Sequence, residues 1–544
     1  MVLCSNFLFF FLLGIALPAT FGDPSGPIVT TKFGKVQGLT VDTARIFRSI
    51  PYAGPVNGSK RWTDPVFPDP WDDVFDATRE GLGCPQNCDL PTPKVSCPTV
   101  QIENCLLLNI FTPLNATADQ NLPVMFFMHG GEFVQGYGGS KLYDGRFLVS
   151  AGIVLVTINY RLGALANLLY GTGDKEIKGN FDIKDQRLAL EWVRMNIAAF
   201  GGNPNDVTIA GQSAGGVSVA VHMVAPKSSG LFQKAIIESY PFASPLKSPD
   251  DARKLGEDFA TALGCGKSND YDCLYSKTMT EVAKATSAVN SKIVDITKIL
   301  EIFLQWTPIV DGEELADQPL TLFEQGKTAD VPLIMGTTSQ EAVLFVYRSF
   351  KTLGALEYDA LLFALYPLHF EEIHKLYSPS NERDQRKVAS VFGTDAIFTC
   401  SSSYAAKVFS ASKDSVSPVY RYIFDHVWSF PDAWDPDSLY HACKNASCHA
   451  SDLPFIFHTP SINGFNFTSD ETALTDSIVR YFTNFVKYGN PNGESANNNE
   501  TLEWTAYSEV GKWMTIIFKT PANEMKSEYR GPYCSVLDNI GYNP

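Results

Sequence analysis

Residues 207–225 read VTIAGQSAGGVSVAVHMVA, a stretch that predicts a strand, a tight turn and a helix in immediate succession. The first five residues form a short β-branched run typical of a buried strand. The small and apolar residues after the turn predict a packed helix that Pro226 stops. Ser213 lies at the tip of the turn between Gly211 and Gly215, where a Cβ would collide with neighbouring backbone. The stretch therefore indicates a turn that exposes a nucleophilic serine at a helix N-terminus.

A glycine-rich turn of a nucleotide-binding fold is the alternative explanation of this stretch. Such a turn uses a phosphate-cradling loop of the form GxGxxG or GxxxxGK[ST]. Neither pattern follows a predicted strand in this chain, so the serine turn is the favoured interpretation.

The remaining chain extends the alternation of strands and helices. The spacing of Leu188, Trp192 and Ile197 predicts a helix over residues 185–200. Because strands alternate with helices, we expect an α/β fold with a mostly parallel sheet. Strands are expected at residues 106–111, 124–128, 153–160, 207–211, 235–239, 332–336 and 420–424, with another helix at 474–487.

The composition of the 544 residues is that of an ordinary globular protein, with 45% hydrophobic and 19% charged residues. The formal net charge is −16, and the sequence pI is about 5.0. This acidic balance argues against nucleic acid or an anionic membrane as a partner.

The N-terminal residues predict a secretory signal peptide over residues 1–22, although they lack the usual Lys or Arg near the start. They carry no charged side chain, and the apolar run over residues 7–17 is too short to span a bilayer. Cleavage after Gly22 would leave residues 23–544 as one soluble domain. We expect it to be secreted or held in a vesicle lumen, with no lipid anchor at its C-terminus.

The cysteines agree with a secretory route. Cys4 leaves with the signal peptide, and the even number that remains from the eleven indicates disulfides. Zinc binding by Cys84, Cys88, Cys97 and Cys105 is the alternative that their spacing leaves open. Candidate glycosylation sites are the sequons at Asn57, Asn115, Asn445, Asn466 and Asn499.

A serine nucleophile needs hydrogen-bond donors for the oxyanion and a base for its proton. The predicted strand 124–128 runs into residues 129–133, HGGEF, whose glycines let main-chain N–H groups face a substrate oxygen. In the hydrolases that use such a turn, the order along the chain is serine, acid, histidine. The histidines that could serve as the base are therefore His369, His374, His426, His441, His449 and His458.

Four stretches together resemble the carboxylesterase/cholinesterase family, also called the type-B carboxylesterase/lipase family. They are residues 103–109 (ENCLLLN), 129–133, 179–193 and 200–216 (FGGNPNDVTIAGQSAGG). The similarity runs from about Ile28 to the end of the chain. The resemblance implies an α/β-hydrolase fold, with a mostly parallel sheet, flanking helices and large loop excursions. It also implies a serine hydrolase that cleaves carboxylic esters without metal or cofactor.

Several site residues follow from this resemblance. Ser213 is expected to be the nucleophile, Glu341 the acid and His449 the base. Ser239 and Asp395 match positions of a supporting polar network behind the histidine.

The expected oxyanion donors are the main-chain N–H groups of Gly131, Glu132 and Ala214. Glu132 departs from the family, which usually has a small residue there, and Ala342 stands where the family usually has glycine. A carboxylate beside a developing oxyanion raises the barrier. We therefore expect Glu132→Gly to hydrolyse small esters faster.

The disulfide pairing is also implied by the resemblance. Three pairs match the family, and the remaining four cysteines would then form two more. The expected pairs are Cys84–Cys105, Cys265–Cys273, Cys400–Cys534, Cys88–Cys97 and Cys443–Cys448.

A weakly active or non-catalytic storage or adhesion protein on the same scaffold is the alternative function. The presence of Ser213, Glu341 and His449 favours the enzyme, which would take a small-molecule ester or a lipid. Choline esters are disfavoured, because residues 84–105 hold no aromatic side chain to face a quaternary ammonium.

Overall fold

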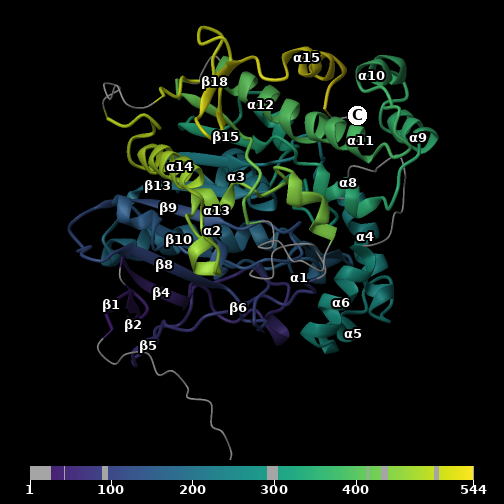
Figure 1. Ribbon diagram of the computed structural model, residues 1–544. Helices are drawn as coiled ribbons and strands as arrows, with labels where there is room; N and C mark the ends of the chain where they lie inside the picture. The colour runs from purple at the N-terminus through teal and green to yellow at the C-terminus, as the bar shows by residue number, and fades with distance from the viewer. Residues whose placement is uncertain are drawn as a thin grey trace, which may run out of the picture.

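The computed structural model describes residues 26–41, 43–88, 96–290, 304–412, 416–430, 439–494 and 502–542. The predicted signal peptide and Asn499 lie outside these residues. The described chain contains one eleven-stranded sheet (Figure 1). In order across the sheet, its strands are β18 (Glu524–Ser527), β17 (Met514–Phe518), β16 (Val419–Phe424), β15 (Leu333–Thr338), β14 (Lys234–Glu238), β13 (Gly202–Gln212), β9 (Leu122–Met128), β10 (Val154–Ile158), β8 (Leu107–Pro113), β4 (Ala44–Pro51) and β3 (Leu39–Val41).

The seven neighbouring strands from β17 to β10 run parallel, and the strands beyond them at both edges are antiparallel. This arrangement confirms the predicted α/β fold with a mostly parallel sheet. Three small sheets lie beside it. They consist of β1 (Ile28–Thr30), β2 (Lys35–Gln37) and β5 (Phe75–Asp76), of β6 (Leu82–Gly83) and β7 (Val100–Gln101), and of β11 (Leu169–Tyr170) and β12 (Ile177–Lys178).

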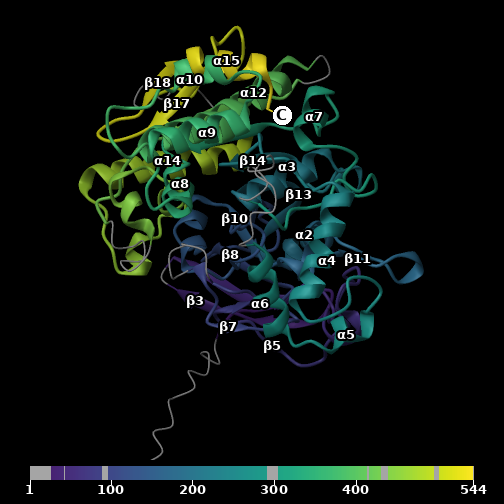
Figure 2. The same ribbon diagram turned by 90° about the vertical axis from the view of Figure 1, so that its right-hand side faces the viewer.

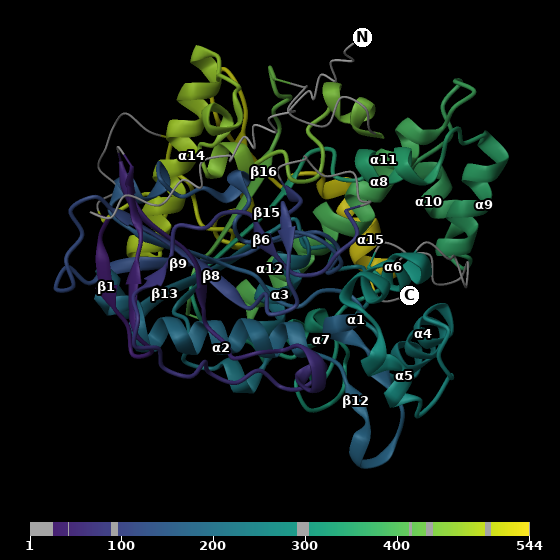
Figure 3. The same cartoon turned by 90° about the horizontal axis from the view of Figure 1, so that it is seen from below.

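Helices cover both faces of the sheet, and β9 is buried on both sides. Val124, Phe126 and Met128 pack in a core that includes α2 (Phe181–Asn196) and α3 (Ala214–Val224). Met125 and Phe127 point the other way, into a core with α14 (Ser469–Tyr488). Figure 3 shows α2 and α14 on opposite sides of the sheet. Burial on both faces explains why this strand is an unbroken apolar run.

The remaining helices lie largely in two groups, each in one excursion from the sheet (Figure 2). One group lies between β14 and β15, and the other between β15 and β16. The first contains α4 (Pro249–Ala262), α5 (Tyr271–Ser276), α6 (Met279–Asn290) and α7 (Pro319–Glu324), and the second contains α8 (Val343–Ser349), α9 (Ala355–Leu365), α10 (Phe370–Leu376), α11 (Arg386–Gly393) and α12 (Cys400–Ala411). The other described helices are α1 (Ala164–Asn167), α13 (Leu453–Ile456) and α15 (Gly531–Ile540).

Helix ends differ from the predicted bounds for local reasons. The predicted helix over residues 185–200 begins at Phe181, directly after the left-handed Asn180, and its last four residues form a 3₁₀ turn. The predicted helix over residues 474–487 begins at Ser469, because Thr468 and Glu471 form a reciprocal capping box.

All five predicted disulfides are present: Cys84–Cys105, Cys88–Cys97, Cys265–Cys273, Cys400–Cys534 and Cys443–Cys448. The four thiols of the alternative zinc site are therefore consumed, and that site is excluded. Cys400–Cys534 joins α12 to α15 across 134 residues.

Four of the five sequons lie on described residues. The side chains of Asn57, Asn115, Asn445 and Asn466 are exposed, as glycan attachment requires. No described helix combines the length and the apolar character that a membrane span needs.

We predict that Gly215→Ala lowers the free energy of unfolding by about 2 kcal/mol or more, because overpacking against backbone is relieved only by moving whole elements. A Cβ at Gly215 would lie 2.0 Å from Met128 O. Gly54→Ala is the control, since its Cβ would meet nothing nearer than 3.5 Å. Denaturant unfolding of both variants measures the difference, and equal stabilities would contradict the prediction.

Candidate active site

The predicted site residues converge at the carboxyl ends of neighbouring parallel strands. Ser213 follows β13, the HGGEF segment of residues 129–133 (the glycine loop) follows β9, and Glu341 lies three residues after β15. These strands run in the order β9, β13, β14, β15, so their ends meet at one edge. His449 reaches the same edge from the segment after β16.

Ser213 occupies a strained turn between β13 and α3. Its φ of 58° and ψ of −121° are sparsely populated for a residue with a side chain. Its N–H donates to Glu238 O at 2.9 Å, and its carbonyl accepts from Val217 N at 2.9 Å. Strand β14 and the first turn of α3 thus hold the serine at the helix N-terminus, with 9% of the residue exposed.

The glycine loop lies against the serine turn. A Cβ on Gly130 would be 3.0 Å from the Cβ of Ser213, and one on Gly131 would be 2.1 Å from Gln135 O. Gly131 also has a φ of 119°, which favours glycine. The N–H of Ala214 belongs to the first turn of α3 and has no intrahelical acceptor. Main-chain donors of the loop and the helix therefore lie beside Ser213.

His449 and Glu341 form a buried hydrogen-bonded pair. Nδ1 of His449 lies 2.6 Å from Oε2 of Glu341. The other carboxylate oxygen accepts from Ser239 Oγ at 2.6 Å and from Thr338 N at 2.7 Å. These donors fix the carboxylate, and the carboxylate fixes the imidazole with Nδ1 protonated and Nε2 available as an acceptor.

Aromatic side chains also confine the imidazole. Its ring centroid lies 5.1 Å from that of Phe345 on α8 and 5.4 Å from that of Phe398. The two phenylalanine rings stack on each other at 5.8 Å. The predicted base is therefore held in place by packing as well as by its carboxylate.

Nε2 of His449 has a neighbour that the sequence analysis did not anticipate. It lies 3.2 Å from Nε2 of Gln212, the residue that precedes the serine. Within the described chain, Ser213 Oγ has no hydrogen bond to His449. Such contacts are often long in a ligand-free site and tighten when substrate binds. The Gln212 amide therefore lies at Nε2 of His449, the acceptor atom to which the Ser213 hydroxyl would donate its proton.

Other described histidines have different environments. Burial lowers the pKa of His129, in the glycine loop, to about 4, and its ring stacks on Tyr160. His426 pairs with Glu471, and His374 lies 3.2 Å from Asp359. Of the histidine side chains that the structure describes, His449 is the one bonded to Glu341.

Asp395 does not join Ser239 in the predicted network behind the histidine. Its oxygens accept from the guanidinium of Arg530 and from the hydroxyl of Tyr377. Ser239 instead donates directly to Glu341. Arg530 supplies the counter-charge of the buried Asp395.

Glu132 carries an unexpected ion pair. Its Oε1 accepts from an Nη of Arg348, on α8, at 2.8 Å. The expectation that this carboxylate raises the barrier, so that Glu132→Gly speeds hydrolysis, assumed an unpaired charge. The structure supplies the counter-charge and removes the basis of that expectation.

A narrow cavity of about 40 Å³ opens at Ser213. Apolar side chains form most of its wall, including Pro241, Leu304, Val346 and Phe398. Glu132 is the acidic residue in this wall. The cavity therefore suits a small apolar group attached to a carbonyl carbon at the serine.

Two buried carboxyl groups lie near the serine turn. Burial raises the pKa of Glu238 well above its usual range, and the charge of Asp452 raises it further. Burial also raises the pKa of Asp452, whose Oδ2 accepts from the Tyr422 hydroxyl at 2.7 Å. Neither side-chain oxygen of Glu238 has a partner among the described residues. Burial without a hydrogen-bonding partner thus favours the protonated form of the Glu238 side chain, while the main-chain carbonyl of the same residue accepts from Ser213 N.

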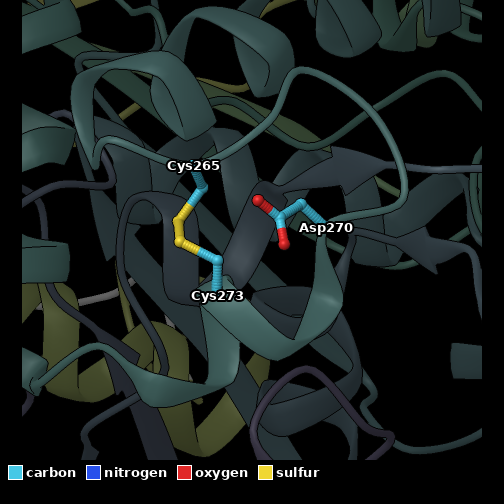
Figure 4. Close-up of side chains that lie close together, drawn as sticks. All are labelled: Cys265, Asp270 and Cys273. Carbon is cyan, nitrogen blue, oxygen red and sulfur yellow. A yellow bond between two sulfur atoms is a disulfide. The ribbon is translucent and has the colours of Figure 1, made fainter.

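The described residues bring together one group with metal-ligand types, Cys265, Asp270 and Cys273 (Figure 4). Both sulfurs are bonded to each other, and Asp270 Oδ2 accepts from Gly266 N at 2.8 Å. A disulfide offers no thiolate to a metal. This cluster is a braced turn and does not fit a metal.

Comparison with known proteins agrees with this geometry. A model of the carboxylesterase family matches residues 25–537. The crystal protein of Dictyostelium discoideum is 36% identical over 94% of this chain and 90% of its own length. The para-nitrobenzyl esterase of Bacillus subtilis (strain 168) is 34% identical over 92% of this chain and 97% of its own. A solved structure of a PNB esterase covers 94% of this chain and 100% of its own, at 32% identity and a TM-score of 0.77.

The fold is that of the α/β-hydrolases, and the class of the protein is that of the carboxylic ester hydrolases. The chain belongs to the carboxylesterase family.

We predict that Glu238→Gln flattens the dependence of stability on pH. A carboxyl whose pKa is raised in the folded state binds its proton more tightly there. It therefore contributes stability below the unfolded-state pKa of about 4.3 and loses that contribution as the pH rises toward the folded-state pKa. From about pH 5 up to the folded-state pKa, the free energy of unfolding of the variant should rise relative to that of the wild type by about 1.4 kcal/mol per pH unit.

Denaturant unfolding at each pH measures this gain. Glu238→Asp, which keeps a carboxyl group, is the control and should retain the wild-type slope. Parallel curves for Glu238→Gln and the wild type would show that Glu238 is ionised in the folded protein.

Proposed function

We propose that the protein hydrolyses carboxylic esters through an acyl-enzyme on Ser213, with His449 as the base and Glu341 as its orienting acid. The observation that carries the proposal is the fixed Glu341–His449 pair beside a serine on a strained turn. Membership of the carboxylesterase family supports the same chemistry. The steps below use groups of this chain, the ester and water.

The proposed reaction has two halves. His449 Nε2 takes the proton of Ser213 as the hydroxyl attacks the ester carbonyl, and then gives it to the leaving alcohol. Water repeats the sequence on the acyl-enzyme and releases the acid. For the first step, the amide of Gln212 has to leave Nε2 so that the serine hydroxyl can donate there.

Main-chain N–H groups of Gly131, Glu132 and Ala214 are the proposed donors to the oxyanion. Their support is the close approach of the glycine loop to the serine turn and the free first turn of α3. One such donor contributes about 3 kcal/mol to lowering the barrier. Preorganised donors of this kind need no rearrangement during the reaction.

The substrates we propose are uncharged esters with a small apolar acyl group. The narrow apolar cavity at Ser213 supports this choice. The name of the Bacillus subtilis relative, a para-nitrobenzyl esterase, supports an ester of a simple alcohol.

The proposed compartment is the secretory route, after removal of residues 1–22, with the rest of the chain as one glycosylated domain. Five disulfides and exposed sequons support it. A storage or adhesion protein without turnover is the competing function, and the assays below separate the two.

Ser213→Ala is predicted to abolish hydrolysis of p-nitrophenyl acetate and covalent labelling by an organophosphate, because the attacking oxygen is gone. Stability should stay close to that of the wild type, since the Ser213 side chain donates no hydrogen bond in the described structure. The measurement is the initial rate together with the mass of the intact protein after labelling. Turnover of the variant well above background would reject Ser213 as nucleophile, and an inactive wild type would favour the storage or adhesion protein.

Phe398→Leu is predicted to shift the preference toward longer acyl chains, because Phe398 narrows the cavity. Room for about one more methylene, at about 0.8 kcal/mol, should raise kcat/KM for octanoate relative to acetate about fourfold. A panel of p-nitrophenyl esters from acetate to palmitate measures the shift. Phe409→Leu, at a buried phenylalanine away from this cavity, is the control and should leave the preference unchanged. An unchanged preference in Phe398→Leu would place the acyl group elsewhere.

A further inference from the structure

The ion pair between Glu132 and Arg348 joins two parts of the site that are 216 residues apart in the chain. Glu132 belongs to the glycine loop after β9. Arg348 lies on α8, which begins two residues after Glu341. The pair therefore links the proposed oxyanion donors directly to the segment that carries the proposed acid.

The two side chains differ in their access to solvent. Arg348 is 32% exposed and Glu132 11%, and Glu132 also lines the cavity that opens at Ser213. The carboxylate thus faces the site while the guanidinium lies toward solvent. A charge held in a narrow, largely apolar cavity acts strongly on a reacting group, because little water screens it.

The backbone of Glu132 needs support. Glu132 and Phe133 have φ values of 55° and 59°, in the left-handed region that residues with side chains rarely adopt. A main-chain donor is useful to an oxyanion only when its direction is fixed. The contact with Arg348 restrains this loop at the residue whose N–H is a proposed donor.

We propose that Arg348 is a positioning and specificity-determining residue of the glycine loop. Its charge cancels the field of Glu132 at the oxyanion, and its N–H group holds the loop. The cancelled charge makes the cavity favour neutral esters over cationic ones. This inference rests on the proposed ester hydrolysis at Ser213.

Glu132→Gln removes the negative charge, and its amide oxygen can still accept from Arg348. Arg348→Gln removes the positive charge, and its shorter side chain also gives up the hydrogen bond to Glu132. Arg348→Lys keeps the positive charge. The double variant Glu132→Gln with Arg348→Gln removes both charges. Thermal unfolding of each variant identifies any loss of folded protein.

The probes are choline acetate and its neutral isostere 3,3-dimethylbutyl acetate, followed by titration of the released acid. They have the same shape and the same acyl group, and they differ in one positive charge. Their kcat/KM ratio reports the field of the site and does not depend on how much of the protein is folded. The kcat for the neutral ester reports stabilisation of the oxyanion.

For Arg348→Gln we expect kcat for the neutral ester to fall about tenfold, which is about 1.4 kcal/mol in the barrier. The preference for the choline ester should rise about tenfold, because Glu132 then attracts the cation. Glu132→Gln leaves Arg348 as an uncompensated cation, so the preference for the choline ester should fall by roughly threefold. The double variant should return to within about threefold of the wild-type ratio, and Arg348→Lys should keep the wild-type ratio.

If the ion pair between Glu132 and Arg348 only stabilises the fold, the measurements give a different result. Both single variants would then lower kcat/KM for the two esters by the same factor, with an unchanged ratio, and this would overturn the inference. An active wild type with that pattern leaves the proposed function standing. A wild type that hydrolyses neither ester nor p-nitrophenyl acetate would overturn the proposed function and the inference with it.

Discussion

The main chain at the end of β9 and the main chain at the start of α3 lie so close together that the serine turn has no room for side chains beside Ser213. A Cβ at Gly215 would lie 2.0 Å from Met128 O, and one at Gly211 would lie 2.4 Å from Gly215 O. The turn can therefore close only with glycine on both sides of Ser213. This closeness brings the end of β9, and with it the glycine loop, against the serine. The position of α3 on β13 and β14 follows from the same contact.

Two buried carboxyl groups near the site, those of Glu341 and Glu238, have different surroundings. Glu341 is held by three hydrogen-bonding partners, Ser239, Thr338 and His449, so its carboxyl group has a fixed orientation. Glu238 has no such partner among the described residues, and burial raises its pKa well above the usual range. Two buried carboxyl groups in the same small region thus differ in the number of hydrogen-bond donors around them, and donors favour the charged form.

The sequence predicted those elements whose structure depends on neighbouring residues in the chain. The glycines of the serine turn and the apolar runs of β9, β13 and β15 predict those elements, because tight turns and doubly buried strands restrict the residues that fit. The ends of α2 and α14 were misplaced by a few residues, since a left-handed Asn180 and the capping box at Thr468 decide them.

Contacts between distant segments left no such pattern in the sequence. The pairing of Glu132 with Arg348 and the amide of Gln212 at His449 depend on how the excursions fold back over the sheet. Asp395 was assigned by resemblance alone, and Arg530, 135 residues away, determines its actual contact. Glu132 could be singled out in the sequence because it departs from the family pattern. Its partner, Arg348, could be found only from the structure.

The two excursions leave the sheet and return to it at strand ends, after β14 and after β15, without interrupting any strand of the parallel core. Both supply wall to the cavity, Pro241 and Leu304 from the first and Val346 and Phe398 from the second. Insertions and exchanges in the first excursion can therefore remodel the cavity wall while Ser213, Glu341 and the glycine loop keep their spacing. The first excursion holds none of Ser213, Glu341 and His449, so its part of the cavity wall can drift during evolution, whereas the second carries Glu341 and is constrained by it.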